Sequence, residues 1–424
     1  MTPPATATFE RDQLLRSYHD VRATTESLCE PLTPEDMVVQ TMPDVSPAKW
    51  HLGHVTWFFE TFVLTAYAAS YETFDPRFRA LFNSYYESVG GAHPRARRGY
   101  LSRPTLEEVL AYRRHVDGAV TALLEGASEE ILERVAPIVE VGMHHEQQHQ
   151  ELLLMDVKHV LGTNPLRPAY KTSPAATHAP ESPLRWHSYK GGRVEVGLSG
   201  DGFAYDNEGP RHTTLLAPFE LATRLVTCAD YLAFMRDGGY ERHDLWLADG
   251  WELVQRERWR APLYWEEADD GWRVMTLGGL RDVAPREPVC HVSYYEADAC
   301  ARWAGCRLPT EFEWERAAQG QALSGVSLES GSYHPRPLDR SPDDGQVAQL
   351  FGDVWEWTAS PYTPYPGYEP FEGALGEYNG RFMVNQIVLR GGSCVTPRRH
   401  LRRTYRNFYY PHQRWMFSGF RLAK

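Results

Sequence analysis

A proline-rich segment, residues 164–184, divides this chain of 424 residues into two halves with different sequence patterns. Before it, apolar residues recur at helical spacing. After it, glycine- and proline-rich turns separate short runs of β-prone residues and many tryptophans. A chain of this length usually needs more than one hydrophobic core. We therefore expect an α+β protein with two domains, residues 1–165 and 186–424, joined by a proline-rich linker over residues 166–185.

The N-terminal half is predicted to form an up-down bundle of four amphipathic helices. Their expected ranges are residues 10–30, 49–69, 106–124 and 138–161. Thr105 and Glu108 form a capping-box pattern at the start of the third helix. Pro137 is compatible with the first turn of the fourth helix. The C-terminal half is expected to be a mixed domain with little regular structure and one clear helix, over residues 295–304.

Composition limits the kinds of partner that the chain can bind. The formal charge of -12 argues against nucleic acid, because binding to phosphates requires concentrated Lys and Arg. No apolar stretch is long enough to span a bilayer, and residues 1–10 lack the apolar core of a secretion signal. The six cysteines show no paired spacing, which is typical of reduced thiols. We expect a cytoplasmic protein that acts on small molecules.

The sharpest local signal lies in residues 144–151, where His145 and His149 are four positions apart. On a helix both imidazoles leave the same face, so one metal ion could bind both. Two further histidines, His51 and His54, lie on a separate predicted helix, and either could be the third ligand. Three neutral imidazoles on one side of an ion leave other positions open, which is typical of a catalytic metal.

The same residues also match the HExxH motif of zinc proteases, with Glu146 as the general base. Two features disfavour that interpretation. Residues 152–155 are an apolar stripe without a third ligand. A histidine ligand far upstream, on another helix, does not fit the class.

Taken together, these residues resemble a known family. His54, with His145, His149 and Glu151, is similar to the DinB-like bundle of the ergothioneine-biosynthetic sulfoxide synthases, the EgtB family. The second half resembles the formylglycine-generating-enzyme fold, which is C-type-lectin-like. The most specific matching segments are Trp-Ala-Gly-Cys-Arg-Leu-Pro-Thr-Glu-Phe-Glu-Trp-Glu at 303–315, Gly-Asp-Val-Trp-Glu-Trp at 352–357, Arg-Gly-Gly-Ser at 390–393 and Gly-Phe-Arg-Leu at 419–422.

One departure from the second pattern is informative. Formylglycine-generating enzymes carry a pair of copper-binding cysteines shortly after the Arg-Gly-Gly-Ser segment, whereas this chain has only Cys394 there. The resemblance therefore implies a domain that keeps the scaffold without the copper chemistry. In the EgtB family this domain supplies the substrate pocket.

The resemblance implies a non-haem iron(II), O2-dependent sulfoxide synthase with His54, His145 and His149 as ligands. It would join a thiol to the imidazole of hercynine (N-alpha-trimethylhistidine) and give hercynylcysteine sulfoxide in ergothioneine biosynthesis. Iron is expected rather than zinc, because O2 activation needs a redox-active ion. The pair Tyr85 and Tyr86 resembles the cysteine-using branch, which favours cysteine over γ-glutamylcysteine as donor. The alternative that the chain is a related enzyme that installs selenium instead of sulfur stays open.

Candidate substrate contacts in the first domain follow from the resemblance for the two tyrosines and from side-chain chemistry for the other residues. Tyr86, supported by Tyr85, would donate a proton or hydrogen atom to the reduced oxygen. Because neighbours on an extended segment point in opposite directions, we expect one catalytic tyrosine rather than two. Arg95 and Arg98 are candidates for the carboxylate of the thiol substrate. Gln148 could hydrogen-bond a bound substrate.

In the second domain, residues 407–409 match the pocket segment of the family. Asn407 could hold the carboxylate of hercynine. Phe408, Tyr409 and Trp415 could face its trimethylammonium group, since aromatic faces bind cations. Core packing is an equal alternative for each of these aromatic side chains.

Two other functions stay possible at this stage. One is a DinB-type metal-dependent thiol transferase or hydrolase that works without O2. The other is a non-catalytic binding module on the formylglycine-enzyme scaffold. The long C-terminal domain disfavours the first, and the histidine triad disfavours the second.

Overall fold

The computed structural model describes residues 10–172, 182–200, 202–339 and 346–424. The chain forms two compact units. The bundle unit comprises Met1–Pro165, Gly200–Phe203 and Pro370–Gly380, and the C-terminal unit comprises Leu166–Ser199, Ala204–Glu369 and Arg381–Lys424. Of the predicted linker, residues 173–181 lie outside the described residues.

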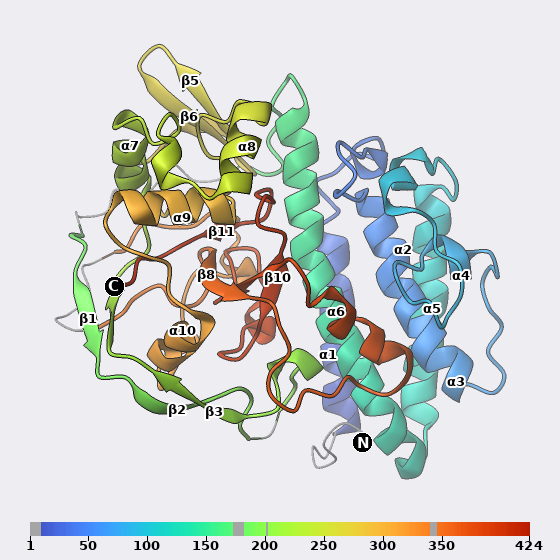
Figure 1. Cartoon of the computed structure of the whole chain (residues 1–424). Coiled ribbons are helices and arrows are strands. Elements are labelled where there is room, and N and C mark those ends of the chain that lie inside the picture. The colour runs from blue at the N-terminus through green and yellow to red at the C-terminus, as the bar shows by residue number, and fades with distance from the viewer. Residues whose placement is uncertain (1–9, 173–181, 201, 340–345) are drawn as a thin grey trace. The chain divides into compact units, whose positions relative to one another are not determined.

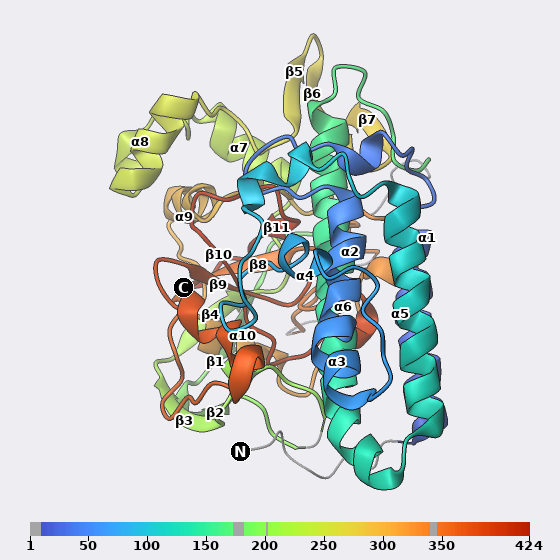
Figure 2. The ribbon, with the colours of Figure 1, turned by 90° about the vertical axis from the view of Figure 1, so that its right-hand side faces the viewer.

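The bundle unit contains the expected four long helices. They are α1 (Arg11–Ser27), α2 (Ala48–Phe59), α5 (Leu106–Gly126) and α6 (Glu129–Thr163). Figures 1 and 2 show them side by side, with α2 and α6 adjacent. A π-helical turn, Glu60–Leu64, follows α2, and the short helices α3 (Thr65–Tyr67) and α4 (Phe78–Leu81) come after it. The predicted helical bundle is confirmed.

The helix ends show where local signals were sufficient and where they were not. The capping box before α5 is present, because the hydroxyl of Thr105 accepts from the Glu108 N–H at 3.2 Å and the carboxylate of Glu108 accepts from the Thr105 N–H at 2.6 Å. The predicted start of the fourth helix was wrong. Ser128 caps α6, so Pro137 lies inside the helix rather than in its first turn.

The C-terminal unit is mixed, as expected. Its strands are β1 (Trp186–Tyr189), β2 (Gly192–Val196), β3 (His212–Leu216), β4 (Phe219–Ala222), β5 (Trp265–Ala268), β6 (Gly271–Thr276), β7 (Gly279–Asp282), β8 (Trp355–Pro361), β9 (Ile387–Arg390), β10 (Asn407–Tyr409) and β11 (Ser418–Gly419). In the described residues they form four small sheets, of which the largest has the order β10-β9-β8-β11. Within it, β11 pairs with β8 in parallel and the other neighbours are antiparallel.

The helices of this unit exceed the single one that was predicted. Besides the expected helix, α9 (Tyr294–Trp303), the unit has α7 (Cys228–Arg236), α8 (Ala248–Glu257) and α10 (Glu311–Ala318). These additional helices are at most 10 residues long, too short for a clear periodic pattern. Capping boxes begin α7, α9 and α10 and satisfy their first N–H groups.

The most specific sequence motifs of the C-terminal unit are part of its core. Trp314, Trp355 and Trp357 are fully buried. Arg390 of the Arg-Gly-Gly-Ser segment donates to Glu315 at 2.6 Å, and Arg421 donates to Glu356 at 2.5 Å. Buried charges need such partners, so these residues maintain the fold rather than line a site. In the described parts of the chain, no helix combines the length and apolarity that crossing a membrane requires.

Candidate metal centre

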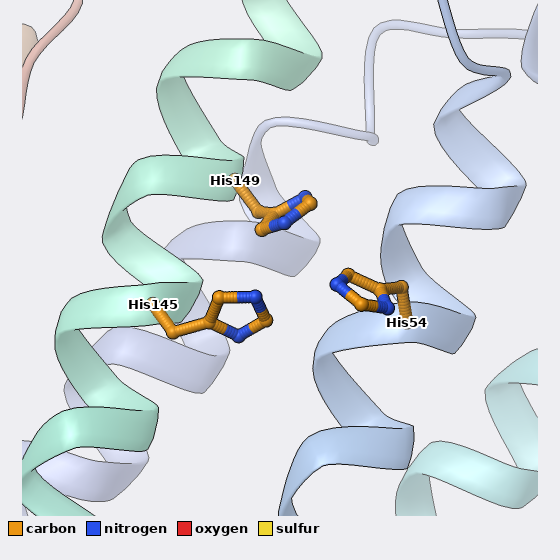
Figure 3. A group of neighbouring side chains, drawn as sticks. All are labelled: His54, His145 and His149. Carbon is orange, nitrogen blue, oxygen red and sulfur yellow. The ribbon is translucent and has the colours of Figure 1, made fainter. Parts of the chain in front are cut away.

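Three histidines from two helices of the bundle unit face one another. His54 comes from α2, and His145 and His149 come from successive turns of α6 (Figure 3). Each offers one ring nitrogen to a set of atoms that all lie within 4.8 Å of one another. The structure thus brings the three predicted ligands together, and His54 rather than His51 belongs to this cluster.

The protonation of the three rings suits metal binding. Burial lowers the pKa of His54 and of His149 well below the ordinary value, and the neighbouring histidines lower both further. Burial also lowers the pKa of His145, to about 4, although Glu146 acts in the opposite direction. All three imidazoles are therefore neutral at pH 7 and have a lone pair to donate.

The unsatisfied ring nitrogens fit a metal ion. The Phe82 carbonyl accepts a hydrogen bond from Nδ1–H of His54 at 2.6 Å, which leaves Nε2 of that ring with its lone pair. Among the described residues, no hydrogen-bond partner reaches Nε2 of His54 or either ring nitrogen of His145. Buried polar atoms without partners are rare. Three neutral nitrogen donors suit a divalent transition metal.

Close packing around α2 fixes the orientation of His54. A Cβ atom on Gly53 would lie 2.2 Å from the Phe82 ring, so glycine is what allows Phe82 to come close enough for its carbonyl to reach His54. The indoles of Trp50 and Trp57 lie nearly parallel to the His54 ring, with centroids 4.6 and 5.6 Å away. The ring is therefore held by a hydrogen bond and by stacking.

Glu146 would be the general base in the zinc-protease alternative, but in the structure it forms buried ion pairs. Its carboxylate accepts from Arg22, Arg113 and the Thr25 hydroxyl, each at 2.7 Å. Burial alone would raise the pKa of Glu146, but Arg113 and Arg22 lower it to about 2. A carboxylate with a lowered pKa whose two oxygens already accept these hydrogen bonds is a poor general base, so the structure argues against the protease interpretation.

The tyrosine pair does not lie on an extended segment, which corrects the expectation that the rings point in opposite directions. The Asn83 side chain accepts from the Tyr86 N–H at 3.1 Å and donates to the carbonyls of Tyr86 and Gly90, each at 3.0 Å, so the backbone folds into a turn. The rings of Tyr85 and Tyr86 consequently lie side by side, 4.6 Å apart, and the Tyr85 hydroxyl donates to that of Tyr86 at 3.4 Å.

Tyr86 is close to the histidine cluster. Its ring is 5.6 Å from that of Trp57, which stacks on His54. Burial raises the pKa of Tyr86, so its phenol keeps its proton at neutral pH.

Arg98 is a buried cation with few anionic neighbours. It donates to the hydroxyls of Ser46 at 2.9 Å and Ser84 at 3.0 Å, and its guanidinium lies 3.2 Å above the centre of the Trp50 ring. Within the described residues, no carboxylate forms an ion pair with it, and burial lowers its pKa. Arg95, the other predicted carboxylate ligand, is exposed. An anion would therefore stabilise Arg98 more than Arg95.

A segment distant in the sequence contributes to the bundle unit, and sequence reasoning missed it. The Tyr378 hydroxyl accepts from the side chain of Gln148 at 3.2 Å, and the Tyr378 ring lies 5.5 Å from that of Tyr85. The neighbouring carboxylate of Glu377 accepts from the backbone N–H groups of Glu87 at 2.8 Å and Ser88 at 3.2 Å. No local sequence pattern in residues 370–380 predicts these contacts.

The remaining predicted residues lie in the C-terminal unit. Asn407, Phe408 and Tyr409 form β10 and are half-buried, and Trp415 is buried. The Phe408 ring stacks on Tyr362 with centroids 4.1 Å apart. Tyr409 meets Trp415 edge to face at 5.7 Å. Packing accounts for these contacts, and the role of the four residues in binding hercynine stays a prediction.

Two family descriptions match the chain and cover most of it. The DinB superfamily matches residues 17–153, and the sulfatase-modifying factor enzyme 1-like domain matches residues 176–341 and 330–424. The formylglycine-generating enzyme of Streptomyces coelicolor is 30% identical over 54% of this chain and 84% of its own length. Fold and site thus define a class: a DinB-type bundle with a histidine triad, fused to a sulfatase-modifying-factor-like domain.

Two curated relatives match this chain over nearly its full length. The hercynine oxygenase of Mycolicibacterium thermoresistibile is 32% identical over 97% of this chain and 95% of its own. That of Mycobacterium tuberculosis is 31% identical over 92% and 93%, respectively. The chain belongs to the hercynine oxygenase family.

Proposed function

We propose that this chain is an Fe(II)- and O2-dependent sulfoxide synthase that joins a thiol sulfur to the imidazole of hercynine. The observation that carries the proposal is the cluster of His54, His145 and His149, whose neutral rings face one another within 4.8 Å. The near full-length similarity to proteins named hercynine oxygenase supports it. Three protein ligands leave open positions for substrates, as in catalytic rather than structural metal sites.

Iron held by these histidines would supply what the side chains lack, a redox-active centre for the reaction of O2 with the two substrates. The protein would contribute position and protons. Phe82 and the two tryptophans beside His54 hold that ligand in one orientation. Glu146 lies on α6 between the two other ligands and anchors that helix to Arg22 and Arg113.

Arg98 would bind the carboxylate of the thiol substrate. Its guanidinium is already oriented by Ser46, Ser84 and Trp50, so little side-chain entropy would be lost on binding. Arg95, exposed on the same short helical segment, would add positive charge near Arg98. Gln148, held by Tyr378, would donate a hydrogen bond to a bound substrate.

Tyr86 would supply the proton or hydrogen atom that the reduced oxygen needs, with Tyr85 as its hydrogen-bond partner. Tyr86→Phe should reduce sulfoxide formation or divert the thiol to a sulfinic acid, as measured by product mass spectrometry. Tyr85→Phe is the matched control and should have the smaller effect. An unchanged product from Tyr86→Phe would remove it from this role.

The two parts of the chain would divide the work. Residues 1–165 would hold the metal, residues 166–185 would link the parts, and residues 186–424 would supply the hercynine pocket. There Asn407 would bind the carboxylate, and Phe408, Tyr409 and Trp415 would face the trimethylammonium group. All six cysteines are free thiols, which agrees with the reducing conditions of the cytoplasm.

The deciding experiment offers hercynine to the Fe(II)-loaded protein together with cysteine and γ-glutamylcysteine in competition, followed by product mass spectrometry. We expect O2 uptake only when hercynine and a thiol are both present, and hercynylcysteine sulfoxide as the main product. The zinc-loaded protein is the matched control and should be inactive. Turnover that continues without O2 would instead favour a thiol transferase. A parallel reaction offers a selenium donor, and incorporation only in that reaction would identify the selenium-installing relative.

A further inference from the structure

His51, the histidine that the metal cluster excludes, lies directly behind one of the ligands. It occupies α2 one turn before His54, and both are buried. Its Nδ1 is 2.8 Å from Nδ1 of His149, and its Nε2 is 3.0 Å from Oδ2 of Asp156. The same Asp156 oxygen accepts from the Ser46 N–H at 2.8 Å. Asp156, His51 and His149 thus form an unbroken line of hydrogen bonds.

The direction of each hydrogen bond in this line can be deduced. The Asp156 carboxylate can only accept, so the proton between it and His51 belongs to Nε2 of His51. A neutral imidazole protonated on Nε2 has a bare Nδ1, and burial of His51 favours the neutral ring. The proton between the two Nδ1 atoms must then belong to His149. A His149 ring protonated on Nδ1 has its lone pair on Nε2, at the other end of the ring.

We propose that Asp156 and His51 are positioning residues that fix His149 as the Nδ1–H tautomer and direct its Nε2 lone pair into the metal cluster. The inference rests on the proposed metal site and deepens it, because it explains why α2 carries two buried histidines. His54 faces the cluster, and His51 orients the ligand opposite.

The three ligands would then differ in how they are oriented. His54 is held directly by a backbone carbonyl, and His149 through His51 by a carboxylate. No partner among the described residues holds the ring nitrogens of His145. A hydrogen-bond acceptor behind a ligating imidazole fixes its tautomer and increases its basicity, and loss of such a partner typically costs 10–100-fold in metal affinity.

The first test measures Co(II) affinity by titration of the full-length protein, using the visible spectrum of the bound ion. His51→Leu removes both hydrogen bonds and should weaken Co(II) binding about 10–100-fold and alter the spectrum. His51→Gln can still accept from His149 and donate to Asp156, so it should restore most of the affinity. His159→Gln, a half-buried histidine farther along α6, is the matched control and should bind as the unmodified protein does.

The second test observes the tautomers directly and needs no variant. In the Zn(II)-loaded protein with 15N-labelled histidine, NMR should show a proton on Nδ1 of His149, a proton on Nε2 of His51 and a bare Nδ1 on His51. A proton on Nδ1 of His51, or unaltered Co(II) affinity in His51→Leu, would overturn the proposal. Neither test involves hercynine or O2, so failure of sulfoxide formation with these results intact would refute the proposed function alone.

Discussion

The two faces of α6 both carry buried polar side chains, but their hydrogen bonding differs. On the face toward α1 and α5, Glu146 and Gln150 are paired with Arg22, Arg113 and Thr25. On the face toward α2, the unpartnered ring nitrogens of His145 point at two other imidazoles. The side chains of the first face are hydrogen-bonded within the protein, whereas those of the second face have lone pairs available for a ligand. The comparison shows that the residues on the facing helices decide what chemistry a sequence motif can perform.

The largest effect on metal binding and activity is expected when a histidine is removed from the face of α6 that faces α2. His145→Ala should lose stoichiometric Fe(II) and reduce sulfoxide formation to background, because two nitrogens from different helices do not complete the site. Iron content and product mass spectrometry measure this. Without metal, its urea unfolding should stay close to that of the unmodified protein. A variant with full iron content would refute the ligand assignment.

A substitution on the opposite face of α6, at Glu146, should lower the stability of the fold. Glu146→Ala removes the carboxylate that joins the buried guanidinium groups of Arg22 and Arg113, which keep Asp117 and Glu26, respectively, as carboxylate partners, and breaking a buried ion pair typically costs about 3–5 kcal/mol. The free energy of unfolding of the metal-free protein in urea, at pH 7, measures the effect. A loss below about 1 kcal/mol would show that the two faces do not differ as described.

A substitution beside the metal-facing side should affect binding rather than folding or chemistry. Arg98→Met keeps the stacking volume over Trp50 and removes the charge. A hydrogen bond to a charged group contributes about 1.5–3 kcal/mol, so KM for cysteine should rise roughly 10–100-fold with a smaller change in kcat. Steady-state O2 uptake separates the two parameters, and the exposed Arg97→Met serves as the matched control. Equal effects of both variants would argue against a specific role for Arg98.

The smallest expected effect is on the pH dependence of stability, through the Glu146 side of α6. Arg113 and Arg22 lower the pKa of Glu146 to about 2 in the folded protein, against 4.5 for the unperturbed group. The folded carboxyl therefore binds its proton less readily than the unfolded one. The stability that it contributes is present above pH 4.5 and is lost as the pH falls toward 2. The metal-free Glu146→Gln protein should lose less stability over this range than the unmodified protein, as followed by urea unfolding at several pH values.

Local patterns in the sequence predict much of this molecule. The i, i+4 spacing of His145 and His149 places both on one helix face in any environment, and the capping box at Thr105 depends only on residues within one turn. The start of α6 was missed because the apolar pattern was taken to begin after Pro137, whereas Ser128 provides an earlier cap.

The errors concern contacts that cross between elements or depend on turns. Tyr85 and Tyr86 lie side by side because three hydrogen bonds of Asn83 bend the backbone there, and the alternation rule for extended chains does not apply to a bent segment. The role of His51 depends on a partner 98 positions away. Residue type alone could not separate His51 from His54, because both lie on the buried side of α2.

The membership of Pro370–Gly380 in the bundle unit has a consequence for protein engineering. The two parts of the chain look like modules that could be exchanged among relatives at the proline-rich boundary. A bundle expressed alone, however, would expose the backbone groups that Glu377 covers and would leave Tyr85 and Gln148 without Tyr378. A transplant of the histidine-triad bundle into another scaffold would have to include residues 370–380, which lie in the second half of the sequence.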